Sequence, residues 1–211
     1  MSHQGLTRQA SIRSRSHVDV WRGVVGAAVL GVTVLGLAAC AGPPLTTYTI
    51  TLPPNVTPEV PSSRQAPIVA VPRVLLPAEV DNTDLIVRDG SVLRRSITGR
   101  WGSRLAIGIT YRLVERLAAR YPQALVLSQE PTDATAMTLR VSISRLTVGS
   151  DGTGVLDADW AVVPRDDRSP ERRQRTRIVL DGPVGTDQDV VALTGALVDR
   201  LAAEINLGTI R

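Results

Sequence analysis

The sequence predicts a single α+β domain, in which two amphipathic helices cover one face of a largely antiparallel sheet. Three observations predict this class. Short segments of alternating apolar and polar residues recur along the chain, and turn signals such as Asp89-Gly90 separate them. Two longer segments carry apolar residues at helical spacing instead. Strands that come in runs, with only two helices among them, are typical of α+β architecture.

The strands are predicted from alternation and from the turn residues that bound them. They cover residues 47–52, 68–76, 84–88, 91–97, 124–127, 137–148, 156–162 and 175–180. Pro72 marks an edge or a break in the second of them. The apolar parity shifts within the sixth, which predicts a β-bulge near Ser144 and Arg145. Residues 53–67 hold five prolines and form either an extended spacer or a loop.

Two helices are predicted, over residues 103–121 and 188–205. Ser103 is a suitable N-cap for the first, and Thr186 with Asp189 three residues later resembles a capping box for the second. The apolar stripes are Leu105, Ile109, Leu113 and Leu117 in the first helix, and Val190, Leu193, Leu197, Leu201 and Ile205 in the second. The charged face of the first helix is expected to meet water: Arg104, Arg112, Glu115, Arg116 and Arg120.

An export signal precedes this domain. A segment with four arginines leads into uncharged, apolar residues 24–40, which end in Leu37-Ala38-Ala39-Cys40. A basic segment, an apolar segment and small residues at the cleavage point are typical of a secretory signal peptide. The last four residues resemble the lipobox of bacterial lipoproteins, whose cysteine is acylated and becomes the new N-terminus. The predicted organisation is a lipoprotein signal peptide over residues 1–39, a lipidated tether over 40–46 and the α+β domain over 47–211.

Two other interpretations of the apolar segment stay open. It could be a plain signal peptide with a chance cysteine, or a retained transmembrane helix, since residues 23–42 are uncharged and about 20 apolar residues span a bilayer. Every interpretation places the chain after residue 43 outside the cytoplasm. If Cys40 is lipidated, it carries an N-acyl and an S-diacylglycerol group, and two or more chains give stable anchoring.

The charge balance gives no indication of a nucleic-acid partner. The whole chain has 24 basic and 20 acidic residues, a formal net charge of +4. Four arginines and one aspartate precede Cys40, so residues 40–211 hold 20 basic and 19 acidic residues, a net charge of +1. A nucleic-acid surface would need a basic stripe with aromatic platforms, so no nucleic-acid partner is expected.

Several kinds of catalysis are excluded by composition. His3 and His17 both precede Cys40, the chain has no lysine, and Cys40 is its single cysteine. The mature part therefore cannot use Ser-His-Asp or Cys-His catalysis, a Schiff base, or zinc bound through histidine and cysteine. It also cannot form an internal disulfide. We expect no catalytic residue, no metal and no cofactor besides the lipid on Cys40, and hence no enzyme.

Four residues remain as candidates for a site. Asp157 and Asp159 lie on one face of a predicted strand, opposite Trp160. Such a pair can act as acid and base on a glycoside, but it is also common on the solvated face of a half-buried strand. Trp101 either anchors the start of the first helix on the core or is an exposed contact aromatic. Arg100 and Trp101 together are the candidate partner contact.

A series of short motifs follows in a characteristic order over residues 37–211. They are Leu37-Ala38-Ala39-Cys40, Tyr48-Thr49-Ile50, Val69-Ala70-Val71-Pro72, Leu76-Pro77, Val80-Asp81, Leu85-Ile86-Val87-Arg88, and Arg100-Trp101 with Leu105. In this order they resemble the family of ABC-type transport auxiliary lipoproteins. The chain is similar in particular to the C component of the paraquat-inducible intermembrane transport system.

The resemblance implies a non-enzymatic lipoprotein at the periplasmic face of the outer membrane. Ala41 fits this location, because an aspartate there typically retains lipoproteins in the inner membrane. The implied partners are an ABC permease and a substrate-binding protein of the mammalian-cell-entry type, which move lipids or other hydrophobic molecules between the envelope membranes. A homo-oligomer is also compatible with the sequence. Two alternatives stay open: a stand-alone assembly or scaffold lipoprotein, and a glycan-processing enzyme that uses Asp157 and Asp159.

Overall fold

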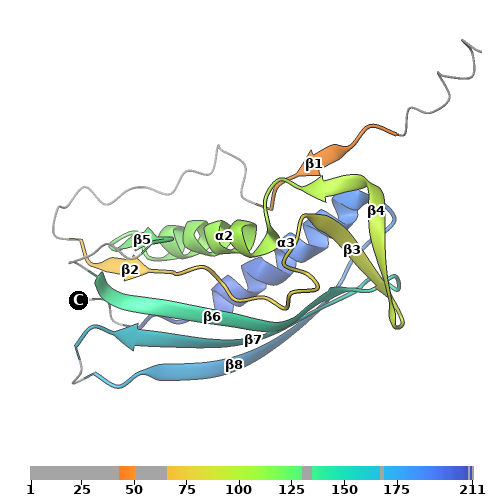
Figure 1. The fold of residues 1–211 in the computed structure, drawn as a ribbon. Helices are drawn as coiled ribbons and strands as arrows, with labels where there is room; N and C mark the ends of the chain where they lie inside the picture. The colour runs from red at the N-terminus through yellow and green to blue at the C-terminus, as the bar shows by residue number, and fades with distance from the viewer. Residues whose placement is uncertain (1–42, 51–65, 130–134, 167–168, 209, 211) are drawn as a thin grey trace, which may run out of the picture. The chain divides into compact units, whose positions relative to one another are not determined.

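The computed structural model describes residues 43–50, 66–129, 135–166, 169–208 and 210. Pro44–Arg211 forms one compact unit. The elements follow in the order β1 Thr46–Tyr48, β2 Ile68–Ala70, β3 Asp84–Asp89, β4 Val92–Trp101, α2 Leu105–Arg120, β5 Leu125–Leu127, β6 Thr135–Val148, β7 Thr153–Pro164, β8 Arg172–Asp181 and α3 Asp187–Glu204. Figure 1 shows this arrangement. The lipobox and the proline-rich residues 53–65 lie outside the described residues.

The smaller of two sheets has the strand order β1-β4-β3. β3 and β4 form an antiparallel hairpin, and Gly90 turns the chain between them with a φ of 59°, which glycine adopts without strain. β1 pairs in parallel with the end of β4, from Thr46 opposite Gly99 to Tyr48 opposite Trp101. The hairpin predicted at the Asp-Gly turn is therefore confirmed.

The larger sheet has the strand order β5-β2-β6-β7-β8. Its long strands β6, β7 and β8 are antiparallel, and a register shift between Ile143 and Arg145 confirms the predicted bulge. The short strand β2 runs parallel to both β5 and β6. α2 lies between β2 and β5 in the chain and supplies the crossover that a parallel pair needs. The α+β class is confirmed, but the strands form two sheets and the short ones pair in parallel.

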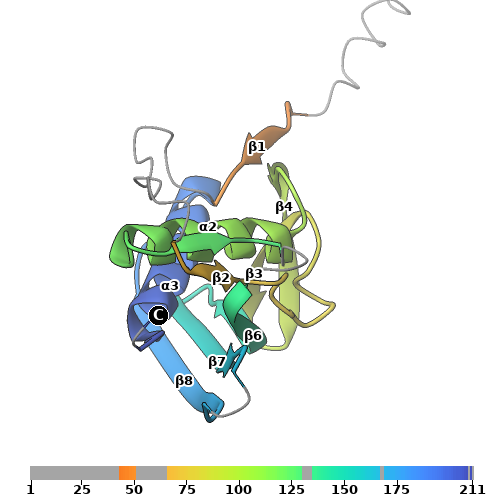
Figure 2. The same cartoon turned by 90° about the vertical axis from the view of Figure 1, so that its left-hand side faces the viewer.

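Both helices cover the same side of β6, β7 and β8, as Figures 1 and 2 show from two directions. Alternate residues of these strands point from that side into the core: Leu139, Val141, Ile143, Leu156, Ala158, Trp160, Val162 and Ile178. The predicted apolar stripes of both helices are buried against them. Because the chain has no phenylalanine, the core is aliphatic apart from Trp101 and Trp160.

The smaller sheet is joined to the first residue of α3. The hydroxyls of Ser96 and Thr98 donate hydrogen bonds to Asp187 Oδ2 over 2.9 and 3.0 Å. Gly99 lies against the same carboxylate, and a Cβ there would collide with it and stand 2.5 Å from Leu85 Cδ1. A larger residue at this position would therefore have to displace the side chains of Asp187 and Leu85.

The two helices begin in different ways. α3 starts with the predicted capping box, in which Thr186 Oγ1 accepts from the Asp189 N–H over 3.2 Å and Asp189 Oδ2 accepts from the Thr186 N–H over 2.9 Å. α2 has Arg104 at its N-cap position, and this residue makes no side-chain capping bond. The N-cap predicted at Ser103 is wrong, because Asp81 supplies the capping acceptor from another loop.

Some strands differ in length from the prediction. β2 ends at Ala70, because Pro72 has no N–H to donate to a ladder. The chain continues beside β6 and rejoins it at Leu75. β8 begins at Arg172, earlier than predicted, because its charged first residues still pair with β7. Arginine-rich residues suit this edge strand, since charges there discourage pairing with other chains.

Candidate functional site

The predicted partner contact lies where β4 ends, just before α2. Trp101 is 5% exposed and belongs to the core. Arg100 is partly exposed, and its Nη1 donates to the carbonyl oxygens of Ser96 and Gly99, while its Nε lies 3.3 Å from a carboxylate oxygen of Asp84. Trp101 therefore anchors the helix entrance in the core, and Arg100 offers the larger accessible surface. Whether a partner binds here stays a prediction.

Asp81, which the sequence showed only as part of the Val80-Asp81 motif and without a role, organises this end of α2. Its Oδ1 accepts a hydrogen bond from the Ala106 N–H over 3.2 Å. Its Oδ2 forms ion pairs with Arg104 at 2.7 Å and Arg73 at 3.1 Å. Burial raises the pKa of Asp81, but the Ala106 hydrogen bond and the two arginines outweigh it and hold the pKa below its ordinary value of 3.8. The charged carboxylate thus caps α2 and fixes Arg73 beside it.

A small cavity of about 270 Å³ opens beside Trp101, between α2 and the residues that end β1. Its lining is largely apolar and aromatic: Tyr48, Ile50, Trp101, Leu105, Gly108 and Tyr111. Ile50 packs closely against the helix, since a Cβ on Gly108 would stand 2.7 Å from Ile50 Cγ2. The cavity is smaller than the roughly 300–1,000 Å³ of ordinary ligand sites.

A single carboxylate links the two helices. Asp199 on α3 accepts hydrogen bonds from Arg112 Nε over 2.7 Å and from Arg116 Nε over 2.8 Å. Arg112 also donates to Ile50 O and its side chain is 14% exposed, so the predicted water-facing position of Arg112 is wrong. Burial raises the pKa of Asp199, but the hydrogen bonds and charges of both arginines outweigh it and hold the pKa below its ordinary value. This cluster ties α2, α3 and the chain after β1 together.

The side of the larger sheet away from the helices carries a row of ion pairs. Asp157 and Asp159 lie on this open face, opposite Trp160 on β7, as predicted. The pairs are Asp157 with Arg145 at 3.4 Å and with Arg177 at 3.7 Å, and Asp159 with Arg175 at 2.7 Å. The hydrogen bond to Asp159 raises the pKa of Arg175. Both candidate carboxylates are therefore engaged by arginines of the adjacent strands.

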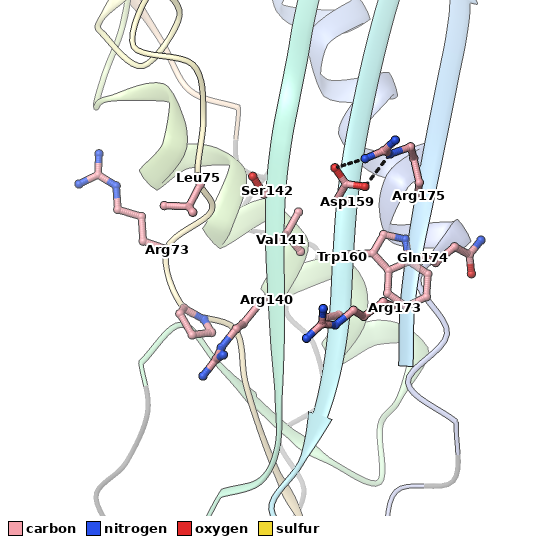
Figure 3. A pocket seen from close by; sticks show the side chains of 12 residues that line it. Arg73, Leu75, Arg140, Val141, Ser142, Asp159, Trp160, Arg173, Gln174 and Arg175 are labelled. Atoms are coloured by element: carbon pink, nitrogen blue, oxygen red, sulfur yellow. Dashed lines mark hydrogen bonds and ion pairs between the residues drawn. The ribbon is translucent and has the colours of Figure 1, made fainter. Parts of the chain in front are cut away.

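A groove of about 720 Å³ lies on the same open face (Figure 3). The segment after β2 borders it with Pro72, Arg73 and Leu75, and the three long strands contribute Arg140, Ser142, Asp159, Ala161, Arg173 and Arg175. Figure 3 shows Arg140, Asp159 and Arg175 on three neighbouring strands, with Asp159 and Arg175 joined across β7 and β8. The lining comes from segments far apart in the chain, so local sequence patterns gave no sign of the groove.

The described ranges contain neither a metal-binding cluster nor a membrane-spanning helix. No three His, Cys, Asp or Glu side chains there are grouped to hold a metal ion. None of the helices in these ranges is long and apolar enough to cross a membrane. The predicted lipidation site Cys40 and its lipobox residues lie outside the described residues, so acylation stays a prediction.

Comparison with solved structures shows that this fold recurs. One crystal structure, of an uncharacterised protein, matches with a TM-score of 0.63 at 16% identity, over 76% of this chain and 95% of the other. A Xanthomonas campestris protein matches with a TM-score of 0.55 at 11% identity, over 75% and 91% of the two chains. At these identities the likeness shows the fold alone. None of the curated proteins matches the chain.

Comparison with protein families defines the class of protein: an auxiliary lipoprotein of an ABC transport system. The model for ABC-type transport auxiliary lipoprotein components matches residues 48–206, well over half of the chain. The chain belongs to this family, and the resemblance inferred from the order of its short motifs is confirmed.

Proposed function

We propose that this protein is an accessory lipoprotein, anchored through Cys40 at the periplasmic face of the outer membrane. It acts by binding the permease and the substrate-binding protein of an ABC transporter of the mammalian-cell-entry type. That transporter moves lipids or other hydrophobic molecules between the envelope membranes. The family match over residues 48–206 carries the proposal, and the lipobox Leu37-Ala38-Ala39-Cys40 supports the anchor.

A role in binding agrees with the chemistry of the described residues. Asp157 and Asp159 are ion-paired with arginines, and no histidine, lysine or further cysteine follows Cys40. An anchor at a membrane surface raises the local concentration of a weak contact, so a modest docking patch suffices. Arg100 and the proline-rich residues 53–67 are the candidates for that patch.

Replacing Cys40 by alanine should abolish lipidation, because the thiol that receives the diacylglycerol is lost. We expect the variant to leave the outer-membrane fraction, either released or as an unprocessed precursor of higher mass. Fractionation of the envelope with mass spectrometry of the protein measures both. Co-fractionation of a Cys40→Ala protein with the outer membrane at the mature mass would contradict the anchor.

The matched control for location is Ala41→Asp, one residue further on. This variant keeps Cys40, so it should still be processed and acylated. Because an aspartate at this position typically retains lipoproteins in the inner membrane, the protein should move to the inner-membrane fraction. If instead the wild-type protein is already found there, the outer-membrane location is wrong.

The role in transport is tested by combining deletions. Deleting this gene should give the same envelope-stress sensitivity as deleting the gene of the transporter's permease. The double deletion should be no more sensitive than either, because both products act in one process. Additive sensitivity would favour the alternative of a stand-alone scaffold or assembly lipoprotein.

A further inference from the structure

We propose that the groove on the open face of the larger sheet binds an anionic phospholipid, with arginines around the phosphate and an acyl chain against Leu75. This inference rests on the proposed function in that it names the class of molecule that the protein would contact during transport. The groove itself, of about 720 Å³, lies within the roughly 300–1,000 Å³ of small-molecule sites.

Leu75 supplies an apolar side chain to the groove, and its backbone is hydrogen-bonded to β6. Leu75 is 67% exposed. The Leu75 N–H donates to Val141 O over 3.1 Å, and the Ile143 N–H donates to Leu75 O over 2.8 Å. These two bonds hold the backbone of Leu75 beside β6, with its side chain exposed. Together with Ala161, it offers an apolar surface that the hydrophobic effect favours covering.

The charged part surrounds this apolar surface. Arg140 on β6 and Arg173 on β8 stand on either side of Ala161 in the strand register. Arg73 and Arg175 also line the groove, where Asp159 is the one acidic lining residue among those described. Three of the four arginines are paired with carboxylates, those of Asp81, Glu171 and Asp159. The groove therefore keeps an excess of one positive charge, which is complementary to an anionic headgroup.

The arginines have donors left for a ligand. Arg173 is bound to Glu171 over 2.9 Å and Arg175 to Asp159 over 2.7 Å, each in an exposed pair. Exposed pairs of this kind contribute little stability, and a guanidinium has five N–H donors in a planar fork. Such forks match the geometry of a phosphate. A phosphate can therefore join these arginines without breaking a strong interaction.

The groove suits an amphiphilic ligand better than an extended peptide. A peptide that joins a sheet gains its affinity from main-chain hydrogen bonds at a free strand edge. The strands under the groove are paired in the order β6-β7-β8, and the edge of β6 beside it is occupied by the residues around Leu75. The outer edge of β8 is free, but its arginines discourage pairing with another strand. Recognition must come from side chains, and these combine a fixed apolar surface with arginines.

The test is a titration of the purified full-length lipoprotein in non-ionic detergent, followed by native mass spectrometry. The probes are lysophosphatidylglycerol, the zwitterionic lysophosphatidylcholine, and inorganic phosphate. We expect one molecule of lysophosphatidylglycerol to bind, at least fivefold more tightly than lysophosphatidylcholine. Inorganic phosphate should bind far more weakly than either, because it cannot use the apolar surface.

Variants locate the site. Arg140→Gln with Arg173→Gln should weaken lysophosphatidylglycerol binding at least tenfold, and Leu75→Ser should weaken the binding of both lysolipids. The matched control is Arg94→Gln, which removes a similarly exposed arginine from β4 and should leave affinity within twofold. All four side chains are exposed, so the melting temperature of each variant should match the wild type.

Three results would overturn the proposal. One is equal lysophosphatidylglycerol affinity in the wild type and the double arginine variant. Another is phosphate binding as tight as lysolipid binding, which would make the site a simple anion site. The third is binding of a hexaglutamate peptide with no lysolipid bound, which would assign the groove to an acidic protein partner.

The lysolipid-binding test and the deletion test can fail independently of each other. If lysolipid does not bind, but the double deletion is no more sensitive than either single deletion, the groove assignment is wrong and the transport role stands. If the deletions prove additive while the double arginine variant loses lysolipid, the groove assignment stands and the transport role is wrong.

Discussion

Replacing Leu113 by aspartate should lower the free energy of unfolding by about 4 kcal/mol, because it removes a buried side chain and places a charge in the core. Leu113 is 0% exposed and lies in the middle of the apolar stripe of α2, which packs into the core. Urea denaturation at neutral pH measures the change. We expect the midpoint to fall sharply or the folded state to be lost.

The matched control is Ala119→Asp on the same helix. Ala119 is exposed, so the same charge is introduced into water and the free energy of unfolding should change by less than about 1 kcal/mol. If both variants unfold at the same urea concentration as the wild type, the buried face assigned to α2 is wrong.

Replacing Asp199 by alanine should have the next largest effect, a loss of about 2 kcal/mol. Removing one partner of a fully buried pair costs about 3–5 kcal/mol, and of an exposed pair about 0–1 kcal/mol. Asp199 is 27% exposed and Arg112 is more buried, so an intermediate value is expected. The variant would leave Arg112 and Arg116 side by side without their shared carboxylate. Glu204→Ala, which removes an exposed pair with Arg200 on the same helix, should cost less than about 0.5 kcal/mol.

The same carboxylate makes stability depend on pH in a defined direction. The folded-state pKa of Asp199 lies below its ordinary value of 3.8, so its ionised form is favoured by folding. Its contribution is fully present above the unfolded pKa and is lost as the pH falls through the folded pKa. The stability difference between the wild type and Asp199→Asn should therefore be constant at neutral pH and shrink below about pH 4. A difference that is unchanged down to pH 2 would contradict the assigned pairing.

The local features of this fold could be predicted from the sequence. The stripes of α2 and α3 and the alternation of β6 and β7 follow directly from apolar periodicity. The Thr186–Asp189 capping box and the Gly90 turn need only neighbouring residues. Each of these signals is complete within a few residues, so no knowledge of the tertiary structure is needed to read it.

The features that the sequence did not reveal all depend on distant partners. Asp81 caps α2 from 25 residues away, and Arg112 is covered because Ile50 and Asp199 reach it from both ends of the domain. The exposure of Leu75 is equally non-local, since an apolar residue in a strand pattern is expected to be buried. Leu75 lies opposite Ser142 of β6, in the segment that follows the end of β2. The groove thus forms because the fold brings the segment after β2 next to β6, β7 and β8.

The central claim is that this lipoprotein acts by binding within an ABC transport system. The most direct measurement is capture of the transporter's substrate-binding component by the full-length lipoprotein from solubilised envelopes, quantified by mass spectrometry. We expect the wild type to enrich the substrate-binding component, and the double variant Asp157→Asn with Asp159→Asn to enrich it equally. The double variant should also restore resistance to envelope stress in a strain that lacks this gene. The claim is contradicted if the wild type captures no transporter component. It is also contradicted if the double variant folds, localises and captures normally yet fails to restore resistance, since the two carboxylates would then be needed for chemistry.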